Sequence, residues 1–207
     1  FLESLSLTNI DIPDSVTLIE WSAFKGCTLL TSVNFSPTSM LTTITALASD
    51  GAFQNCGLTQ ITLPNGVSYI QGYTFANSKL TSITIPPSIT RIGYAAFQYI
   101  YPLTEVIFSS GPGNILPKIN RIDGNAFAYA TNLTSITIPN SVTLIESQAL
   151  GPCDQLKSIT LLSKTLNINT LACNQSRRLE TIQLYASTIT YLNSVGHDPV
   201  IPINGGN

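Results

Sequence analysis

Four cysteines and one histidine are the residues of this chain best suited to metal binding or nucleophilic catalysis. No Cys-x-x-Cys pair occurs, and His197 has no partner at metal-ligand spacing, so the sequence lacks a zinc signature. A nucleophile–base pair cannot be built around one histidine near the end of the chain. Gly111-Pro112-Gly113 is not followed by the Lys-Ser/Thr of a phosphate loop, and the acidic residues are scattered. We therefore expect no enzyme, no metal site and no cofactor.

Three Asn-x-Ser/Thr sequons could carry glycans, namely Asn34-Phe35-Ser36, Asn132-Leu133-Thr134 and Asn174-Gln175-Ser176. Chance matches are expected in a chain so rich in Asn, Ser and Thr. Asn132 is the best candidate because it lies at a corner before a predicted strand. Asn34 lies on a strand face, where a glycan would obstruct the surface.

The composition argues against some classes of binding partner. Hydrophobic residues make up 43% of the 207, charged residues only 10%, and the net charge is −2. No basic patch predicts nucleic-acid binding, no apolar run is long enough to span a bilayer, and no signal-peptide pattern is present. The polar surface must therefore consist mainly of Ser, Thr, Asn and Gln.

An internal repeat is the main signal. Residues 80–102 (LTSITIPPSITRIGYAAFQYIYP) and 133–155 (LTSITIPNSVTLIESQALGPCDQ) share one template. We place its first leucine at Leu2, Leu30, Leu58, Leu80, Leu103, Leu133, Leu156 and Leu179. This spacing predicts a solenoid of about eight coils over residues 1–194, the last incomplete. Residues 195–207 drop the repeat and are interpreted as a cap or linker, in which Pro199 and Pro202 stop the ladder.

Each slot of the template has a physical role. Leu80, Ile83 and Ile85 have the spacing of a strand with one face inward, and a proline often follows where that strand ends. A second short extended stretch comes next. The Ala-Phe pair after it, for example Ala96-Phe97, predicts a short helical or 3₁₀ turn, with the phenylalanines stacked from coil to coil. Stacking is required because one coil cannot bury its own apolar face.

The string L-T-S-I-T-I-P-x-S-V-T-x-I-x-x-x-A-F-x-x-C resembles the BspA-like (Treponema pallidum type) leucine-rich repeat, from Leu2 to about Leu192. The resemblance implies a right-handed leucine-rich-repeat superhelix with a parallel β-ladder on one face. It also implies a secreted or cell-surface location and a non-catalytic role in adhesion or recognition. Ala172-Cys173 departs from the Ala-Phe pair without threatening the fold.

The outward slots of the long strand form a neutral hydroxyl and amide ladder, such as Ser82/Thr84 and Ser135/Thr137. The simplest interpretation is a solvated strand face. Two alternatives are a recognition sheet for a protein or glycan and an ice-binding threonine array, which Gln60, Glu105, Ile107 and Gln183 would interrupt.

One coil breaks this ladder and gives our predicted partner-binding site. Glu105 and Ile107 replace the small polar pair, and the turn-rich insertion Ser109–Pro117, with Asn114 and Ile115, leaves the same strand. Tyrosines lie in the turns of neighbouring coils, and two of them share a slot and should stack. The tyrosines assigned to this site are Tyr94, Tyr99, Tyr101 and Tyr129.

Two further expectations concern pairing. Cys27, Cys56 and Cys153 share one inward slot, so we expect buried structural thiols, although a Cys27–Cys56 disulfide is geometrically conceivable. The apolar start of the chain predicts an uncapped end, through which copies could stack into a filament, sheath or surface layer. Self-assembly is therefore the alternative to adhesion to host or matrix proteins.

Overall fold

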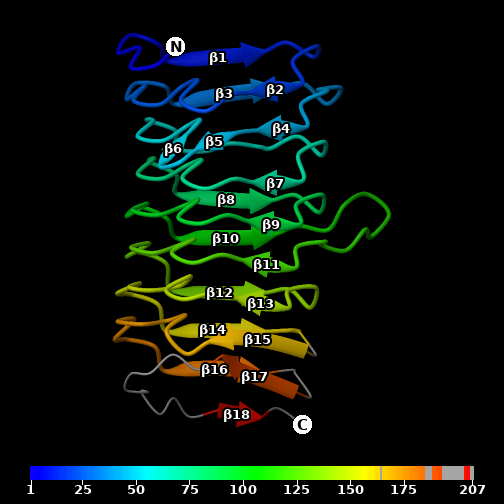
Figure 1. Cartoon of the computed structure of the whole chain (residues 1–207), viewed down its shortest axis with the longest axis vertical. Coiled ribbons are helices and arrows are strands. Elements are labelled where there is room, and N and C mark those ends of the chain that lie inside the picture. The colour runs from blue at the N-terminus through cyan, green and yellow to red at the C-terminus, as the bar shows by residue number, and fades with distance from the viewer. Residues whose placement is uncertain (164, 185–187, 193–202, 206–207) are drawn as a thin grey trace.

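The protein is a stack of parallel β-coils that runs from β1 at one end to β18 at the other (Figure 1). The computed structural model describes residues 1–163, 165–184, 188–192 and 203–205. Every strand pairing between coils is parallel. The predicted solenoid of about eight coils is therefore confirmed.

Two ladders run along the stack, and nearly every described coil contributes one strand to each. The strands of the first ladder are β1 (Asn9–Ile12), β3 (Ser32–Phe35), β8 (Ser82–Ile85), β10 (Glu105–Phe108), β12 (Ser135–Ile138), β14 (Ser158–Leu161), β16 (Thr181–Leu184) and β18 (Ile203–Gly205). The strands of the second are β2 (Leu18–Ile19), β4 (Thr43–Ile44), β7 (Tyr69–Ile70), β9 (Arg91–Ile92), β11 (Arg121–Ile122), β13 (Leu144–Ile145), β15 (Thr165–Asn169) and β17 (Thr188–Leu192). The coil that begins at Leu58 joins the first ladder only by a bridge between Thr62 and Thr84.

The register follows the template. Ile83 lies opposite Val106 in the first ladder, and Ile122 lies opposite Ile145 in the second. Equivalent slots therefore face one another, and each inward residue extends the same core. The remaining strands, β5 (Ala46–Leu47) and β6 (Asp50–Gly51), form an antiparallel hairpin within the insertion around residues 46–51.

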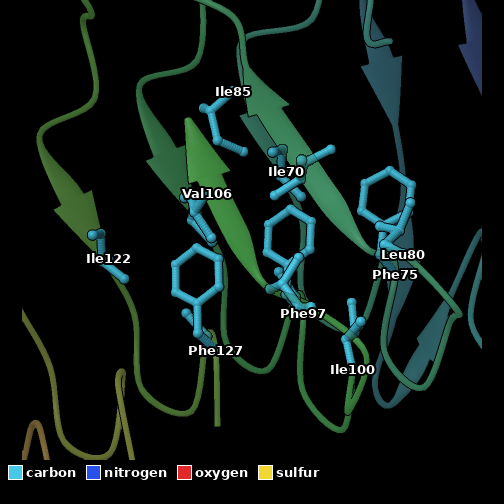
Figure 2. Packing of buried hydrophobic residues seen from close by; sticks show 14 of the residues in the cluster. Ile70, Phe75, Leu80, Ile85, Phe97, Ile100, Val106, Ile122 and Phe127 are labelled. Atoms are coloured by element: carbon cyan, nitrogen blue, oxygen red, sulfur yellow. The ribbon is translucent and has the colours of Figure 1, made fainter. Parts of the chain in front are cut away.

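A column of phenylalanines forms the centre of the core, as the repeat predicted. The rings of Phe1, Phe24, Phe53, Phe75, Phe97 and Phe127 stack in sequence, with centroids 5.2–5.5 Å apart. Figure 2 shows Phe75, Phe97 and Phe127 in a row beside Ile70, Leu80 and Ile122. Phe53, Phe75, Phe97 and Phe127 have no exposed surface.

The predicted helical or 3₁₀ turn at the Ala-Phe pair is wrong, since the described part of the chain contains no helix. Left-handed residues flank the pair instead, for example Ala95 (φ 55°) and Tyr99 (φ 60°) around Phe97. The amides there alternate in direction: Ala96 N donates to Gly93 O within the coil, whereas Phe97 N donates to Ala126 O of the next. A helix would direct all these amides along its own axis, so none of them would bond the turn to the next coil.

The predicted start of the first repeat also needs correction. Ile10 pairs with Val33, so Leu7 rather than Leu2 is equivalent to Leu30, and the interval is the ordinary 23 residues. The first repeat therefore begins with Leu7–Pro13 (LTNIDIP), and it contains no insertion relative to the template. Phe1 occupies the phenylalanine slot of a preceding turn and stacks on Phe24 at 5.4 Å.

The first ladder continues further than the sequence predicted. β18 pairs with β16, with Ile203 opposite Ile182, so Pro199 and Pro202 do not stop it. A proline before a strand removes no ladder hydrogen bond from the strand itself. Residues 195–202 and 206–207 of the predicted cap or linker lie outside the described residues.

Candidate binding surfaces

The first ladder is interrupted at the coil that the sequence singled out. β10 pairs with β8, but no described backbone hydrogen bond joins β10 to β12. Twelve residues, 109–120, connect β10 to β11, whereas five, 86–90, connect β8 to β9. The insertion begins directly after β10, and Figure 1 shows its loop projecting from the stack.

A groove of about 510 Å³ lies between β10 and β12. Ile107 lines it from β10 and is 41% exposed, and Leu116 of the insertion lines it and is 61% exposed. The other apolar residues of the lining are Val106, Phe108, Pro117, Pro139 and Leu162, and Thr137 of β12 lines it as well. We call this surface the β10–β12 groove. The sequence predicted Ile107 as a binding residue but not Leu116 or Leu162. Leu162 could not be predicted because only the stacking of coils brings it close to β10.

The insertion is held in shape by its own backbone. Gly111 N donates to Ile115 O at 2.7 Å, and Asn114 takes a left-handed conformation (φ 60°). Asn114 and Ile115 are exposed beside the groove rather than in its lining. Glu105 is exposed at the start of β10. These predicted residues therefore share one side of the molecule with the groove.

The predicted tyrosines line other hollows. Tyr94 lines a groove of about 460 Å³ with Asn125 and Gln148, and Tyr99 and Tyr101 line a smaller one of about 350 Å³. Neither lining includes a residue of β10. The structure thus divides the single predicted site into two surfaces. The predicted stack of Tyr99 on Tyr129 is confirmed, with ring centroids 4.6 Å apart.

The hydroxyl and amide ladder is built largely as expected on the first face. Thr84, Thr137 and Asn34 are exposed, and Asn34 Nδ2 donates to Asp11 Oδ1 at 2.8 Å. This bond occupies the amide of one predicted glycosylation site. Asn132 is exposed before β12, and Asn174 is partly buried at a turn, so Asn132 stays the preferred acceptor in our prediction.

All four cysteines are free thiols, and Cys27, Cys56 and Cys153 are buried in the slot predicted for them. Cys27, Cys56 and Cys153 donate their Sγ–H to the carbonyl groups of Phe1, Phe24 and Phe127, each in the preceding coil. Burial raises the pKa of Cys56 and of Cys153 to about 12. A thiol so far from ionisation is a poor nucleophile and a poor metal ligand, which agrees with a structural role.

An ion-pair network on the second ladder was not predicted. Asp123 is 4% exposed at its side chain, and Arg91 and Arg121 both bond to it, at 2.6 Å. Arg121 also reaches Glu146 of the next coil at 2.5 Å. The hydrogen bond to Asp123 raises the pKa of Arg91. The signal in the sequence was that Arg91 and Arg121 occupy one slot of adjacent coils and that an acid directly follows the corresponding strand of the next coil in each case.

The described residues contain no group of three or more His, Cys, Asp or Glu that could hold a metal ion. They also contain no helix with the length and apolar character needed to cross a membrane.

Comparison with known proteins agrees with this architecture. A family model described as the BspA type leucine-rich repeat region matches residues 1–116 and 120–195 in six copies. The chain belongs to this family. No curated protein matches it.

Solved structures share the fold. A leucine-rich repeat protein from Bacteroides ovatus is 22% identical, with a TM-score of 0.53, and the match covers 93% of this chain and 62% of that one. A leucine-rich cell surface protein from Faecalibacterium prausnitzii is also 22% identical, with a TM-score of 0.50 and coverage of 92% and 61%. This chain thus spans less than two thirds of the length of either relative.

Proposed function

We propose that this protein is a secreted or cell-surface recognition protein that binds a protein partner through the β10–β12 groove and its rim. The carrying observation is the break between β10 and β12. It exposes Ile107, Leu116 and Leu162 together on a face whose other outward residues are mostly small and polar. Clustered exposed apolar side chains beside polar residues are typical of protein interfaces.

The family and one relative support the location and the class. Repeat solenoids of this kind present extended surfaces that suit protein recognition, and the relative from Faecalibacterium prausnitzii is described as a cell surface protein. The groove is small for a whole interface, so the exposed side chain of Ile115 and the carboxylate of Glu105 at the rim would contribute to it. The proposed activity is binding, and it requires no catalytic group.

The test is a double variant, Glu105→Lys with Ile107→Ala, measured by surface plasmon resonance against a panel of purified extracellular-matrix and serum proteins. We expect the native chain to bind at least one of them and the double variant to bind it at least tenfold more weakly. Both positions are exposed, so the thermal unfolding temperature should stay unchanged.

The matched control is Ser158→Lys with Thr160→Ala, which changes the equivalent slots of β14 two coils further along. It should bind like the native chain. Equal loss in both double variants would contradict a site at the groove, as would unchanged binding by the first. Light scattering at two concentrations separates the alternative, in which the partner is a second copy of this chain.

A further inference from the structure

We infer that a second binding surface, on the turns beside the phenylalanine column, takes an uncharged, linear glycan. The residues of this surface, which we call the tyrosine–amide strip, are aromatic or carry side-chain amides. They are Gln54, Asn55, Tyr73, Asn77, Tyr94, Gln98, Tyr99, Tyr101, Asn125, Tyr129 and Gln148. The strip shares no lining residue with the β10–β12 groove.

The backbone under the strip is fixed. Tyr73, Tyr99 and Tyr129 are all left-handed, with φ of 56–64°. Each donates its backbone N–H to a carbonyl of the next coil, at 3.1, 2.9 and 2.9 Å. Their side chains therefore project from a framework that is already ordered before any ligand binds, which reduces the entropic cost of binding.

Tyrosine is conformationally unfavourable at positions 99 and 129. A bulky residue with positive φ is uncommon, and Gly26, Asn55 and Asn77 take the equivalent slot in earlier coils at lower conformational cost. Backbone geometry alone does not call for tyrosine at positions 99 and 129. The half-buried ring of Tyr129 stacks on the ring of Tyr99, which is 38% exposed and can contact a molecule outside the chain.

The side chains form two open grooves on either side of a tyrosine contact. Tyr73 lines the groove of about 350 Å³, Tyr94 lines the groove of about 460 Å³, and their rings meet edge to face at 5.7 Å. The hydroxyl group of Tyr94 accepts a hydrogen bond from Asn125 Nδ2 at 2.8 Å. Both volumes are in the range of small-molecule sites, about 300–1,000 Å³.

The chemistry of the linings favours a sugar. Apart from Ala76, every residue that lines the smaller groove is Tyr, Asn or Gln. In the larger groove the one carboxylate, Glu146, is already bound by Arg121 and by the backbone N–H of Gly124. Tyrosine rings pack against the C–H faces of pyranose rings, and amides both donate to and accept from hydroxyl groups. Without free charge, the strip suits a neutral ligand.

The spacing of the strip favours a chain of sugars over a single one. Adjacent coils lie about 4.8 Å apart, which is close to the length of one pyranose unit in an extended polysaccharide. The Tyr99–Tyr129 stack repeats one side chain at 4.6 Å, and Tyr73 and Tyr94 of two neighbouring coils lie 5.7 Å apart. A linear glycan laid along the turns would therefore meet tyrosine rings in successive coils.

The experiment is affinity gel electrophoresis with four soluble neutral polysaccharides (mannan, xylan, β-glucan and galactan) and two anionic ones (heparin and hyaluronan). We expect at least one neutral polysaccharide to retard the native chain, with neither anionic one doing so. Tyr94→Ala and Tyr99→Ala should each weaken that interaction tenfold or more. A third variant, Gln98→Ala, removes one side-chain amide and leaves the aromatic contacts intact.

Trp21→Ala is the matched control, because Trp21 is exposed and occupies the slot of Tyr94 three coils away, outside both grooves. It should be retarded like the native chain. The proposal is overturned if no neutral polysaccharide retards the chain, if only the anionic ones do, or if folded strip variants are retarded as strongly as the native chain. It is also overturned if strip variants lose a protein partner instead. Since these outcomes do not involve Ile107, they leave the proposed protein-binding function to its own test.

Discussion

Two neighbouring junctions between coils differ in the number of β-ladders that pair across them. The coils that begin at Leu80 and Leu103 pair along both ladders, through β8 with β10 and β9 with β11. The coils that begin at Leu103 and Leu133 pair along the second ladder alone, through β11 with β13. The buried turns do not register the difference, because Phe97 N donates to Ala126 O at 2.8 Å across the first junction and Phe127 N donates to Ala149 O at 2.9 Å across the second.

The comparison teaches that the core and the second ladder hold the coils together, which leaves the first ladder free to open. The ion-pair network strengthens this division, because Arg91 and Asp123 bridge the closed junction and Arg121 and Glu146 bridge the open one. An insertion placed between β10 and β11 can therefore create a groove without breaking the solenoid.

The largest effect should come from the buried column. Phe97→Ala removes a ring with no exposed surface that stacks on Phe75 in one neighbouring coil and on Phe127 in the other. We expect a loss of about 3–5 kcal/mol in the free energy of unfolding, measured by urea denaturation. Ile107→Ala, on the open ladder, is the control and should change it by less than about 0.5 kcal/mol. Similar losses in both variants would contradict the division between core and first ladder.

A smaller effect is expected from the ion-pair network. Asp123→Asn keeps the size of the side chain but removes the charge that Arg91 and Arg121 share. We expect a loss of about 1–2 kcal/mol, less than for a fully buried pair, because both arginines are more than a third exposed. The loss should shrink in high salt, which screens exposed charge. Glu105→Gln provides the control, and a loss that does not depend on salt would argue against an electrostatic origin.

The smallest effect on stability is expected from a shortened insertion. Replacing residues 109–120 with the five-residue connection 86–90 is also the most direct test of what the insertion does. If the long connection holds β10 away from β12, shortening it should let these strands pair. The amides of β10 and β12 should then exchange with solvent more slowly, as measured by hydrogen–deuterium exchange. The free energy of unfolding should change by about 1 kcal/mol or less, because closing a shorter loop costs only slightly less entropy. Unchanged exchange would show that the break has another cause.

The repeat alone predicted most of the fold. Inward slots such as Ile83 and Phe97 recur at a fixed interval, and only stacked coils can bury them all, so the parallel solenoid and the phenylalanine column follow from local pattern. The same pattern identified the unusual coil through Ile107 and predicted the Tyr99–Tyr129 stack. It misplaced the first repeat at Leu2 because it counted leucines, whereas strand pairing starts the repeat at Leu7.

The tertiary structure decided what no single coil contains. The helical turn expected at Ala-Phe gave way to left-handed residues because their amides must reach the next coil, a demand that the local sequence does not reveal. The groove at Ile107 needs Leu116 from the insertion and Leu162 from two coils further along, and the buried Asp123 needs two arginines thirty residues apart. Local periodicity fixes what each coil buries, but only contact between coils determines which surfaces remain open for binding.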